Sequence, residues 1–366
     1  MIKIIHSADM HICRDTMSLS ALKNLINEAN KRDTDVLLIS GDLFDTPFPE
    51  KELAFEVISI LENCHAQVFI SPGNHDPFIA GSVYDIYEFP ENVYIFKTSE
   101  VKHLRARCGA DIYGYAFTSH SEGRHPLPEI SDKSRISIYS IHADLGTGSN
   151  YAPISQTDIE LTKADYVALG HIHKRTEILQ AGNTKFSYCG SLLSRDFGEC
   201  GRKGAIYGEF EKENGICSAY FEFLPISKSH FEELTVKVSD IENEDELISG
   251  IIQTISSNGY DKNTSLRITL KGEISHNINP TSLLFKPIED RLELLEIVNK
   301  TTEKILKRDL ENDKTIKGEV YKVLKDMMES ENEEKSQAAR LALRLVFAAL
   351  RNEDPEDILE TETDDL

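Results

Sequence analysis

The chain of 366 residues has no uninterrupted apolar run long enough to span a membrane, which takes roughly 20 residues. Its first residues, Met1 to His6, lead directly into an expected strand and lack the charged and apolar regions of a signal peptide. We therefore expect no membrane association and a cytoplasmic location.

The six cysteines are scattered, and no two of them form a CxxC pair. Structural zinc ribbons need paired cysteines, and small secreted folds need a dense set of them, so we expect reduced thiols. The sequence also lacks a GxxxxGK[ST] loop, which predicts that the chain itself is not an ATPase.

The chain has few basic residues relative to acidic ones, with 40 Lys and Arg and 62 Asp and Glu, which gives a net charge of −22. Proteins that bind nucleic acid usually carry a basic surface. Part of the excess lies at the C-terminus, where 8 of the last 14 residues, 353–366, are acidic and predict a flexible tail. Two bound divalent cations would add about four positive charges locally, so the acidity does not exclude a phosphate-binding site.

Five short motifs occur in the first half of the chain, nearly all of them just after an expected strand. They are Asp9-Met10-His11, Gly41-Asp42, Gly73-Asn74-His75-Asp76, His142 and Gly170-His171-Ile172-His173. A single motif of this kind is weak evidence, since Gly-Asp pairs occur by chance in most proteins. The ordered set supplies seven side chains of metal-ligand type and predicts a two-metal hydrolytic site. The predicted ligands are Asp9, His11, Asp42, Asn74, His142, His171 and His173.

The spacing of these residues suggests their roles. Residues two apart on an extended backbone face the same side, so Asp9 and His11 are predicted to hold one ion together. A lone carboxylate such as Asp42 suits a bridge between ions about 3.5–4 Å apart. Several imidazoles favour Mn, Fe or Zn over Mg or Ca. His75 is the predicted catalytic residue, and if pairing with Asp76 protonates it, it becomes a general acid for the leaving alkoxide.

Hydrophobic periodicity predicts an α/β fold, namely a four-layer α/β/β/α sandwich followed by a small α+β domain and C-terminal helices. Strands are expected at 3–7, 36–40 and 67–71, with helices at 18–32 and 50–63 between them. Shorter strands from Val93 onward predict the second sheet. The predicted domains are 1–225 for the sandwich, 226–316 for the α+β domain, 317–352 for the helices and 353–366 for the acidic tail. Residues 334–350 are expected to form a helix with one apolar face that needs a partner surface.

The order of these motifs resembles that of the calcineurin-like metallophosphoesterases. Within that superfamily, the segments Gly41 to Asp45 and Tyr188 to Glu199 look like the SbcD-type DNA repair exonucleases, including the YhaO-like branch. The resemblance covers about 1–224, and residues 233–298 look like the family's capping domain in layout only. It implies one metal held by Asp9, His11, Asp42 and His173. It implies a second metal held by Asp42, Asn74, His142 and His171, with His75 facing the substrate.

The resemblance further implies a hydrolase that cleaves DNA phosphodiesters with two divalent ions, with Mn²⁺ as the expected metal. It implies that this nuclease subunit works with a separately encoded SbcC-like coiled-coil ATPase, docked on the C-terminal helices, and it allows a homodimer. The acidic composition leaves open an alternative, a metal-dependent phosphodiesterase or phosphatase acting on small nucleotides or phosphoproteins. A non-catalytic scaffold is a further alternative, although the complete ligand set argues against it.

Overall fold

The computed structural model describes residues 1–146, 148–239, 241–275, 278–280, 282–303 and 307–351. The chain divides into two compact units, Met1–Phe231 and Glu232–Leu366. The predicted acidic tail lies outside the described residues, and the predicted domain boundaries stay predictions. All six cysteines are free thiols. Among the described residues, no helix combines the length and apolar character needed to cross a bilayer.

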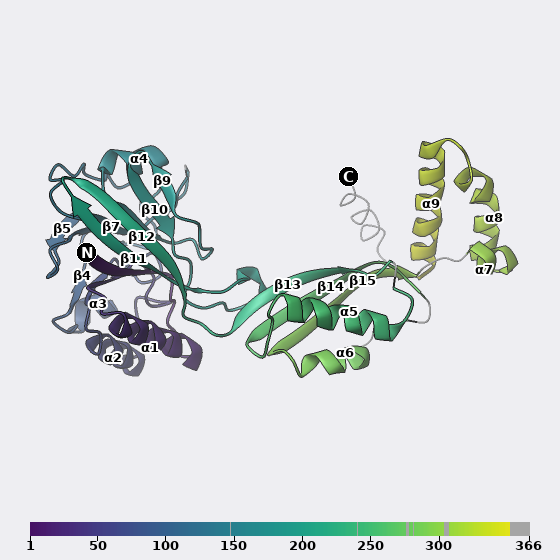
Figure 1. Cartoon of the computed structure of the whole chain (residues 1–366), viewed down its shortest axis with the longest axis horizontal. Helices are drawn as coiled ribbons and strands as arrows, with labels where there is room; N and C mark the ends of the chain where they lie inside the picture. Colours follow the sequence, from purple (N-terminus) through teal and green to yellow (C-terminus); the bar gives the residue numbers. More distant parts are fainter. Residues whose placement is uncertain (147, 240, 276–277, 281, 304–306, 352–366) are drawn as a thin grey trace. The chain divides into compact units, whose positions relative to one another are not determined.

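The first sheet of the N-terminal unit has the strand order β12-β11-β1-β2-β3-β4. Figure 1 labels β4, β11 and β12 of this sheet. Its strands are β1 (Ile2–Ser7), β2 (Val36–Ile39), β3 (Gln67–Ile70), β4 (Val93–Ile95), β11 (Gly204–Glu213) and β12 (Ile216–Pro225). Strands β1 to β4 run parallel, and β11 pairs antiparallel with both β1 and β12. The helices on its outer face are α1 (Thr16–Lys31), α2 (Lys51–Glu62) and α3 (Val83–Ile86). Asp15 caps α1 by accepting a hydrogen bond from the Ser18 amide at 2.6 Å.

The second sheet has the order β5-β6-β7-β8-β10-β9. Its strands are β5 (Lys102–Arg105), β6 (Asp111–Gly114), β7 (Ser137–His142), β8 (Tyr166–Gly170), β9 (Leu179–Ala181) and β10 (Thr184–Tyr188). Strands β6, β7, β8 and β10 run parallel. Helix α4 (Gln156–Thr162) lies on the outer face, where Ile159 is buried against the sheet. It begins at a capping box in which Ser155 and Asp158 bond each other's backbone amides.

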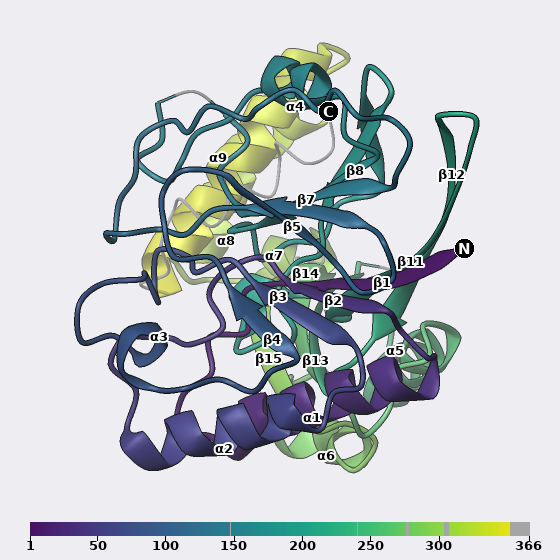
Figure 2. The same ribbon diagram turned by 90° about the vertical axis from the view of Figure 1, so that its left-hand side faces the viewer.

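The two sheets pack face to face around a shared core, and Figure 2 shows the order helices, first sheet, second sheet and α4. Buried apolar side chains from both sheets fill this core, among them Val36, Leu38, Phe69, Ile138 and Tyr166. The predicted four-layer fold is confirmed. One expectation is wrong, because β4, β11 and β12 belong to the first sheet and not to the second. The long-range pairing of β1 with β11 decides this, and local periodicity does not encode it.

The carboxyl ends of β1, β2, β3, β7 and β8 meet at one edge of the sandwich, as parallel strands require. Gly170, at the end of β8, marks how closely the two sheets approach there. A Cβ added to Gly170 would lie 1.8 Å from the Ser40 carbonyl oxygen and 3.0 Å from the Ala8 Cβ. Only a residue without a side chain fits at this point, so the segments that follow β1, β2 and β8 are held together.

The second unit contains a three-stranded sheet in the order β13-β14-β15. Its elements are β13 (His230–Lys237), α5 (Glu244–Ser257), β14 (Thr264–Ile274), α6 (Ser282–Glu289) and β15 (Leu294–Glu303). The helices cover one face, where Leu247, Ile251 and Phe285 pack with Leu266 and Ile268. This is the strand, helix, strand, helix, strand pattern expected for a small α+β unit.

Three helices follow, namely α7 (Lys307–Asn312), α8 (Ile316–Met328) and α9 (Glu333–Arg351). The expected helix at 334–350 is confirmed, but its apolar face is displaced from the predicted one. The sequence predicts the face along Ala338, Leu341, Ala342, Leu345, Val346 and Ala349, whereas the buried positions of α9 are Ala339, Leu343 and Phe347. These pack on Tyr321 and Met328 of α8. The helix is apolar over a wide arc, so sequence alone does not determine which part of the arc meets α8.

We expect Gly170→Ala to destabilise the N-terminal unit by about 1–3 kcal/mol, the usual cost of overpacking. The added methyl group would collide with the Ser40 carbonyl, which belongs to the backbone and cannot rotate away. Urea unfolding would measure the change. Gly123→Ala is the matched control, because an added Cβ there has no neighbour within 4 Å among the described residues. Equal unfolding midpoints for Gly170→Ala and the control would show that the strands do not approach this closely.

Candidate metal centre

Four of the predicted ligands lie on an unusual backbone. Asp9, His11, Asp42 and His171 have positive φ angles of 50°, 44°, 51° and 106°. The predicted extended geometry for Asp9 and His11 is therefore wrong, although both side chains still reach the same site. Their segment is held to the one after β2, because the Asp42 carbonyl oxygen accepts from the amides of Met10 and His11, each at 2.9 Å. A left-handed backbone at a non-glycine residue costs of order 1–3 kcal/mol and persists only where the surroundings enforce it.

Asp42 lies at the centre of the cluster. Its Oδ2 is 3.7 Å from His11 Nε2 and 3.4 Å from His142 Nε2, while its Oδ1 accepts a hydrogen bond from the His75 amide at 2.9 Å. A Cβ on Gly73 would lie 2.2 Å from Asp42 Oδ1, so the glycine is what allows this approach. One carboxylate thus faces imidazoles on both sides, which is the arrangement expected of a bridging ligand.

His11 and His173 face each other with their Nε2 atoms 3.0 Å apart. Each ring has a carboxylate at its other nitrogen: Asp45 is 3.2 Å from His11 Nδ1, and Glu199 is 2.5 Å from His173 Nδ1. A neutral ring that donates from Nδ1 carries a lone pair on Nε2. Glu199 raises the pKa of His173, so without a cation His173 can hold a proton on Nε2 and donate it to His11. A cation that replaced this proton would be bound by both Nε2 atoms. Asp9, His11 and His173 place three ligand atoms within 4.8 Å of one another around this point.

A second pair of facing acceptors lies on the other side of Asp42. His142 Nδ1 donates to the Ser40 carbonyl at 3.1 Å, which leaves its Nε2 as an acceptor 2.8 Å from Asn74 Oδ1. Asp9, Asp42 and His142 form a further group with ligand atoms within 4.8 Å. Asn74 is thus brought to this half as predicted.

His171 is placed differently from the other predicted ligands. Its amide donates to both Asp9 carboxylate oxygens, at 2.9 and 3.1 Å, and its ring centroid lies 5.2 Å from that of His142. It belongs to none of the three close groups of ligand atoms found among the described residues. The structure therefore brings six of the seven predicted ligand side chains into close contact and leaves the His171 ring at their edge.

Burial shifts the protonation of these groups. It raises the pKa of Asp9 from 3.8 to about 8, helped by the nearby Asp42, and raises the pKa of Asp42 to about 6. Burial and neighbouring imidazoles lower the pKa of His11 to about 2 and that of His171 to about 4, and burial lowers that of His142 to about 3. Neutral imidazoles are the form that binds metals, and a divalent cation would favour the charged carboxylates. The donor set, nitrogen with carboxylate oxygen, fits Mn, Fe or Zn.

His75 lies at the open side of the cluster, with 47% of its side chain exposed. Its predicted pairing with Asp76 is wrong. Asp76 is buried and accepts hydrogen bonds from the Phe44 and Gly73 amides and from the Tyr84 hydroxyl. The carboxylate that faces His75 is Asp45, 3.8 Å from Nδ1. Asp45 lies in the Gly41 to Asp45 motif, so its position was visible in the sequence, but its role was not.

Five basic residues near the motifs are candidates for phosphate contacts in the sequence, namely Lys174, Arg175, Arg195, Arg202 and Lys203. Three of them have other partners. Arg195 donates to the His11 carbonyl, and Lys203 donates to the His173 carbonyl at 2.9 Å. Arg175 lies over the Phe223 ring, 4.6 Å from its centroid. Arg195 and Lys203 stabilise the ligand segments themselves. His120, which fits none of the five motifs, lies next to the site, because its Nδ1 is 2.9 Å from the Asn74 carbonyl oxygen.

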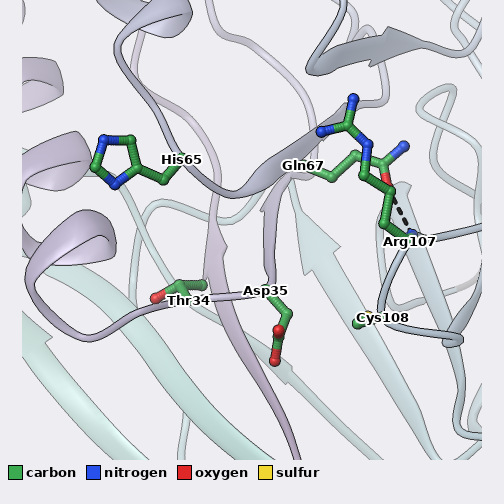
Figure 3. A pocket seen from close by; sticks show the side chains of 6 residues that line it. All are labelled: Thr34, Asp35, His65, Gln67, Arg107 and Cys108. Atoms are coloured by element: carbon green, nitrogen blue, oxygen red, sulfur yellow. Dashed lines mark hydrogen bonds between the residues drawn. The ribbon is translucent and has the colours of Figure 1, made fainter.

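A separate pocket of about 310 Å³ lies at the opposite edge of the first sheet, where β2 and β3 begin (Figure 3). It is lined by Thr34, Asp35, His65, Gln67, Arg107 and Cys108. Asp35 accepts a hydrogen bond from the Lys3 amide and Gln67 from the Arg107 amide, so these polar groups serve the fold. None of the predicted site residues lines it.

In the metal-free protein, we expect stability to fall as the pH rises from about 6.5 to 8. Asp9 and Asp76 have folded pKa values of about 8 and about 7, well above the usual 3.8, so the folded state holds protons that the unfolded chain has already released. The pKa of His173 is raised by its hydrogen bond to Glu199 and acts in the same direction. The lowered imidazole pKa values change the stability only below about pH 6.5, where the imidazoles of the unfolded chain become protonated. Melting temperatures of chelator-treated protein test this, and Asp9→Asn should flatten the slope; a rise over this interval would contradict it.

A family of known proteins matches the part of the chain that holds this site. The calcineurin-like phosphoesterase family matches residues 2–175, which contain every predicted ligand and His75. The uncharacterized metallophosphoesterase YhaO of Bacillus subtilis (strain 168) is 28% identical over 282 residues, covering 69% of this chain and 67% of the relative. Two solved structures are more distant. TT1561 of Thermus thermophilus is 14% identical with a TM-score of 0.38 and covers 52% of this chain and 90% of its own. A dimetal phosphatase from Danio rerio is 8% identical with a TM-score of 0.39 and covers 57% and 92%.

The order of the motifs, the ligand cluster and the match over residues 2–175 together make this part of the chain similar to the calcineurin-like phosphoesterases.

Proposed function

We propose that this chain is a metal-dependent phosphodiesterase that acts as a DNA exonuclease in DNA repair. The observation that carries the metal-dependent part is two pairs of facing side chains of metal-ligand type, His11 with His173 and His142 with Asn74, on either side of Asp42. Divalent ions at these places, with Mn²⁺ as the proposed metal, would polarise phosphoryl oxygens and supply a nucleophile at neutral pH.

The chain's own residues have two tasks in this chemistry. The buried carboxylates and imidazoles would hold the ions. His75, exposed at the open side with Asp45 behind it, is placed to donate a proton to the leaving oxygen of a bound phosphodiester. Asp45 also contacts His11, so one carboxylate orients both a ligand and the substrate-facing imidazole.

The choice of DNA as substrate rests on the resemblance of the Gly41 to Asp45 and Tyr188 to Glu199 segments to SbcD-type nucleases. An SbcC-like ATPase is the proposed partner, and the exposed apolar residues Ile316, Val323 and Met327 of α8 offer it a surface. We further propose a homodimer that forms through Phe55 of α2 and Ile86 of α3, which are both exposed. The proposed location is the cytoplasm.

We expect His75→Ala to lower phosphodiester hydrolysis by about 10²- to 10⁴-fold, the usual contribution of a general acid. Metal content should stay near the wild-type value, because His75 is an exposed residue at the mouth of the site. Rates with Mn²⁺ on single-stranded and duplex DNA, together with metal analysis, would measure both effects. His65→Ala is the control, since this exposed histidine lines the pocket at the opposite edge.

Asp42→Ala provides the contrast. Asp42 contacts both halves of the cluster, so its loss should remove both ions together with activity. A His75→Ala protein that cleaves DNA at the wild-type rate would show that this histidine is not the acid.

A substrate panel tests the choice of DNA. Rates on oligonucleotides, a cyclic nucleotide and a chromogenic phosphodiester should be highest on DNA. The net charge of −22 favours the alternative of a small-nucleotide phosphodiesterase or a phosphatase acting on phosphoproteins, and a lower DNA rate would select it. Binding of two ions without hydrolysis of any substrate would indicate a non-catalytic scaffold.

A further inference from the structure

The segment from Tyr188 to Lys203 covers one half of the metal site. It approaches His173 through Gly190, whose φ is +77° and whose missing Cβ would lie 2.9 Å from the His173 carbonyl oxygen. The next residue, Ser191, donates its amide to the same oxygen at 3.1 Å. A glycine is required here both for its left-handed backbone and for the close approach.

Three charged side chains of this segment converge on the two imidazole residues of that half. Glu199 Oε1 lies 2.5 Å from His173 Nδ1. Lys203 donates to the His173 carbonyl at 2.9 Å, and Arg195 donates to the carbonyl of His11. Both the ring and the backbone of His173 are therefore fixed by residues that are not ligands themselves.

A local turn holds Glu199 in place. The short helix η1 (Phe197–Glu199) begins at Asp196, whose side chain accepts a hydrogen bond from the Gly198 amide at 2.7 Å. The Ser194 hydroxyl donates to the Glu199 carbonyl at 2.9 Å. The carboxylate is half-buried, so its position depends little on side-chain freedom.

In the other half of the site, the hydrogen-bond partner of the imidazole is different. His142 Nδ1 bonds a neutral carbonyl, that of Ser40, at 3.1 Å, and the Asp9 carboxylate lies 3.8 Å from the same nitrogen. His173 and His11 each have a carboxylate closer to Nδ1, at 2.5 and 3.2 Å. A carboxylate hydrogen-bonded to an imidazole fixes its tautomer and makes it a stronger metal donor, and losing such a partner typically lowers metal affinity about 10–100-fold. The two halves therefore differ in the hydrogen-bond partners of their imidazoles.

We propose that Glu199 is a positioning residue that acts through His173 and makes the half formed by Asp9, His11, Asp42 and His173 the tighter of the two metal sites. The inference rests on the metal-dependent function proposed above. It also gives the Tyr188 to Glu199 segment a physical role, namely to orient one imidazole pair toward its ion.

Titration of the full chain with Mn²⁺, followed by electron paramagnetic resonance of the free ion, tests the proposal. The wild type should show two binding steps of different affinity. Glu199→Ala should weaken the tighter step by about 10–100-fold and leave the weaker step near its wild-type value. Glu199→Gln, which keeps the size of the side chain and removes its charge, should fall between the two. Glu177→Gln is the control, because Glu177 is an exposed acid beside Arg175.

The outcomes separate this inference from the proposed function. A wild type that binds no Mn²⁺ would remove the basis of both. Two wild-type steps that persist unchanged in Glu199→Ala and Glu199→Gln would overturn the role of Glu199 and leave the proposed function standing. Equal weakening of both steps would overturn the asymmetry. Melting of the metal-free variants checks folding, and Glu199→Gln carries the test if Glu199→Ala does not fold.

Discussion

The centre of this protein depends on a group of acids and imidazoles that the fold buries close together. Nitrogen and oxygen atoms that could bind a cation face each other at about hydrogen-bond distance on both sides of one buried carboxylate. Burial of such groups is costly unless a cation compensates them. The surrounding fold therefore has to be stable enough to hold an arrangement that is unfavourable until positive charge arrives.

The sandwich supplies that stability through its topology. Parallel strands from two sheets end at one edge, and the buried core between the sheets fixes the distance between those ends. The ligands lie on short segments beyond the strands, and the segments after β1 and β2 bond each other through their backbones. Glycines at the points of closest approach let backbone and ligand atoms share the limited space.

Much of this was predictable, for a physical reason. Strand and helix positions follow from hydrophobic periodicity, and polar residues placed after successive parallel strands must converge. What sequence could not give depends on contacts between distant residues. The pairing of β11 with β1 decides which sheet the late strands join. The carboxylate facing His75 is Asp45 and not the adjacent Asp76, because Asp76 is turned inward to Tyr84. Glu199 belongs to the Tyr188 to Glu199 segment that the sequence singles out. Its hydrogen bond to His173 depends on a turn that local sequence does not predict.

The left-handed backbone at Asp9, His11 and Asp42 has a consequence for how this lineage can evolve. Glycine or asparagine would adopt this backbone conformation at a lower energy cost than aspartate or histidine. Substitutions to those residues would therefore stabilise the fold, and only selection for function removes them. A descendant that no longer needs this cluster should lose these three residues early and become more stable as it does so. Inactive relatives could then be recognised by glycine at the positions of Asp9, His11 and Asp42.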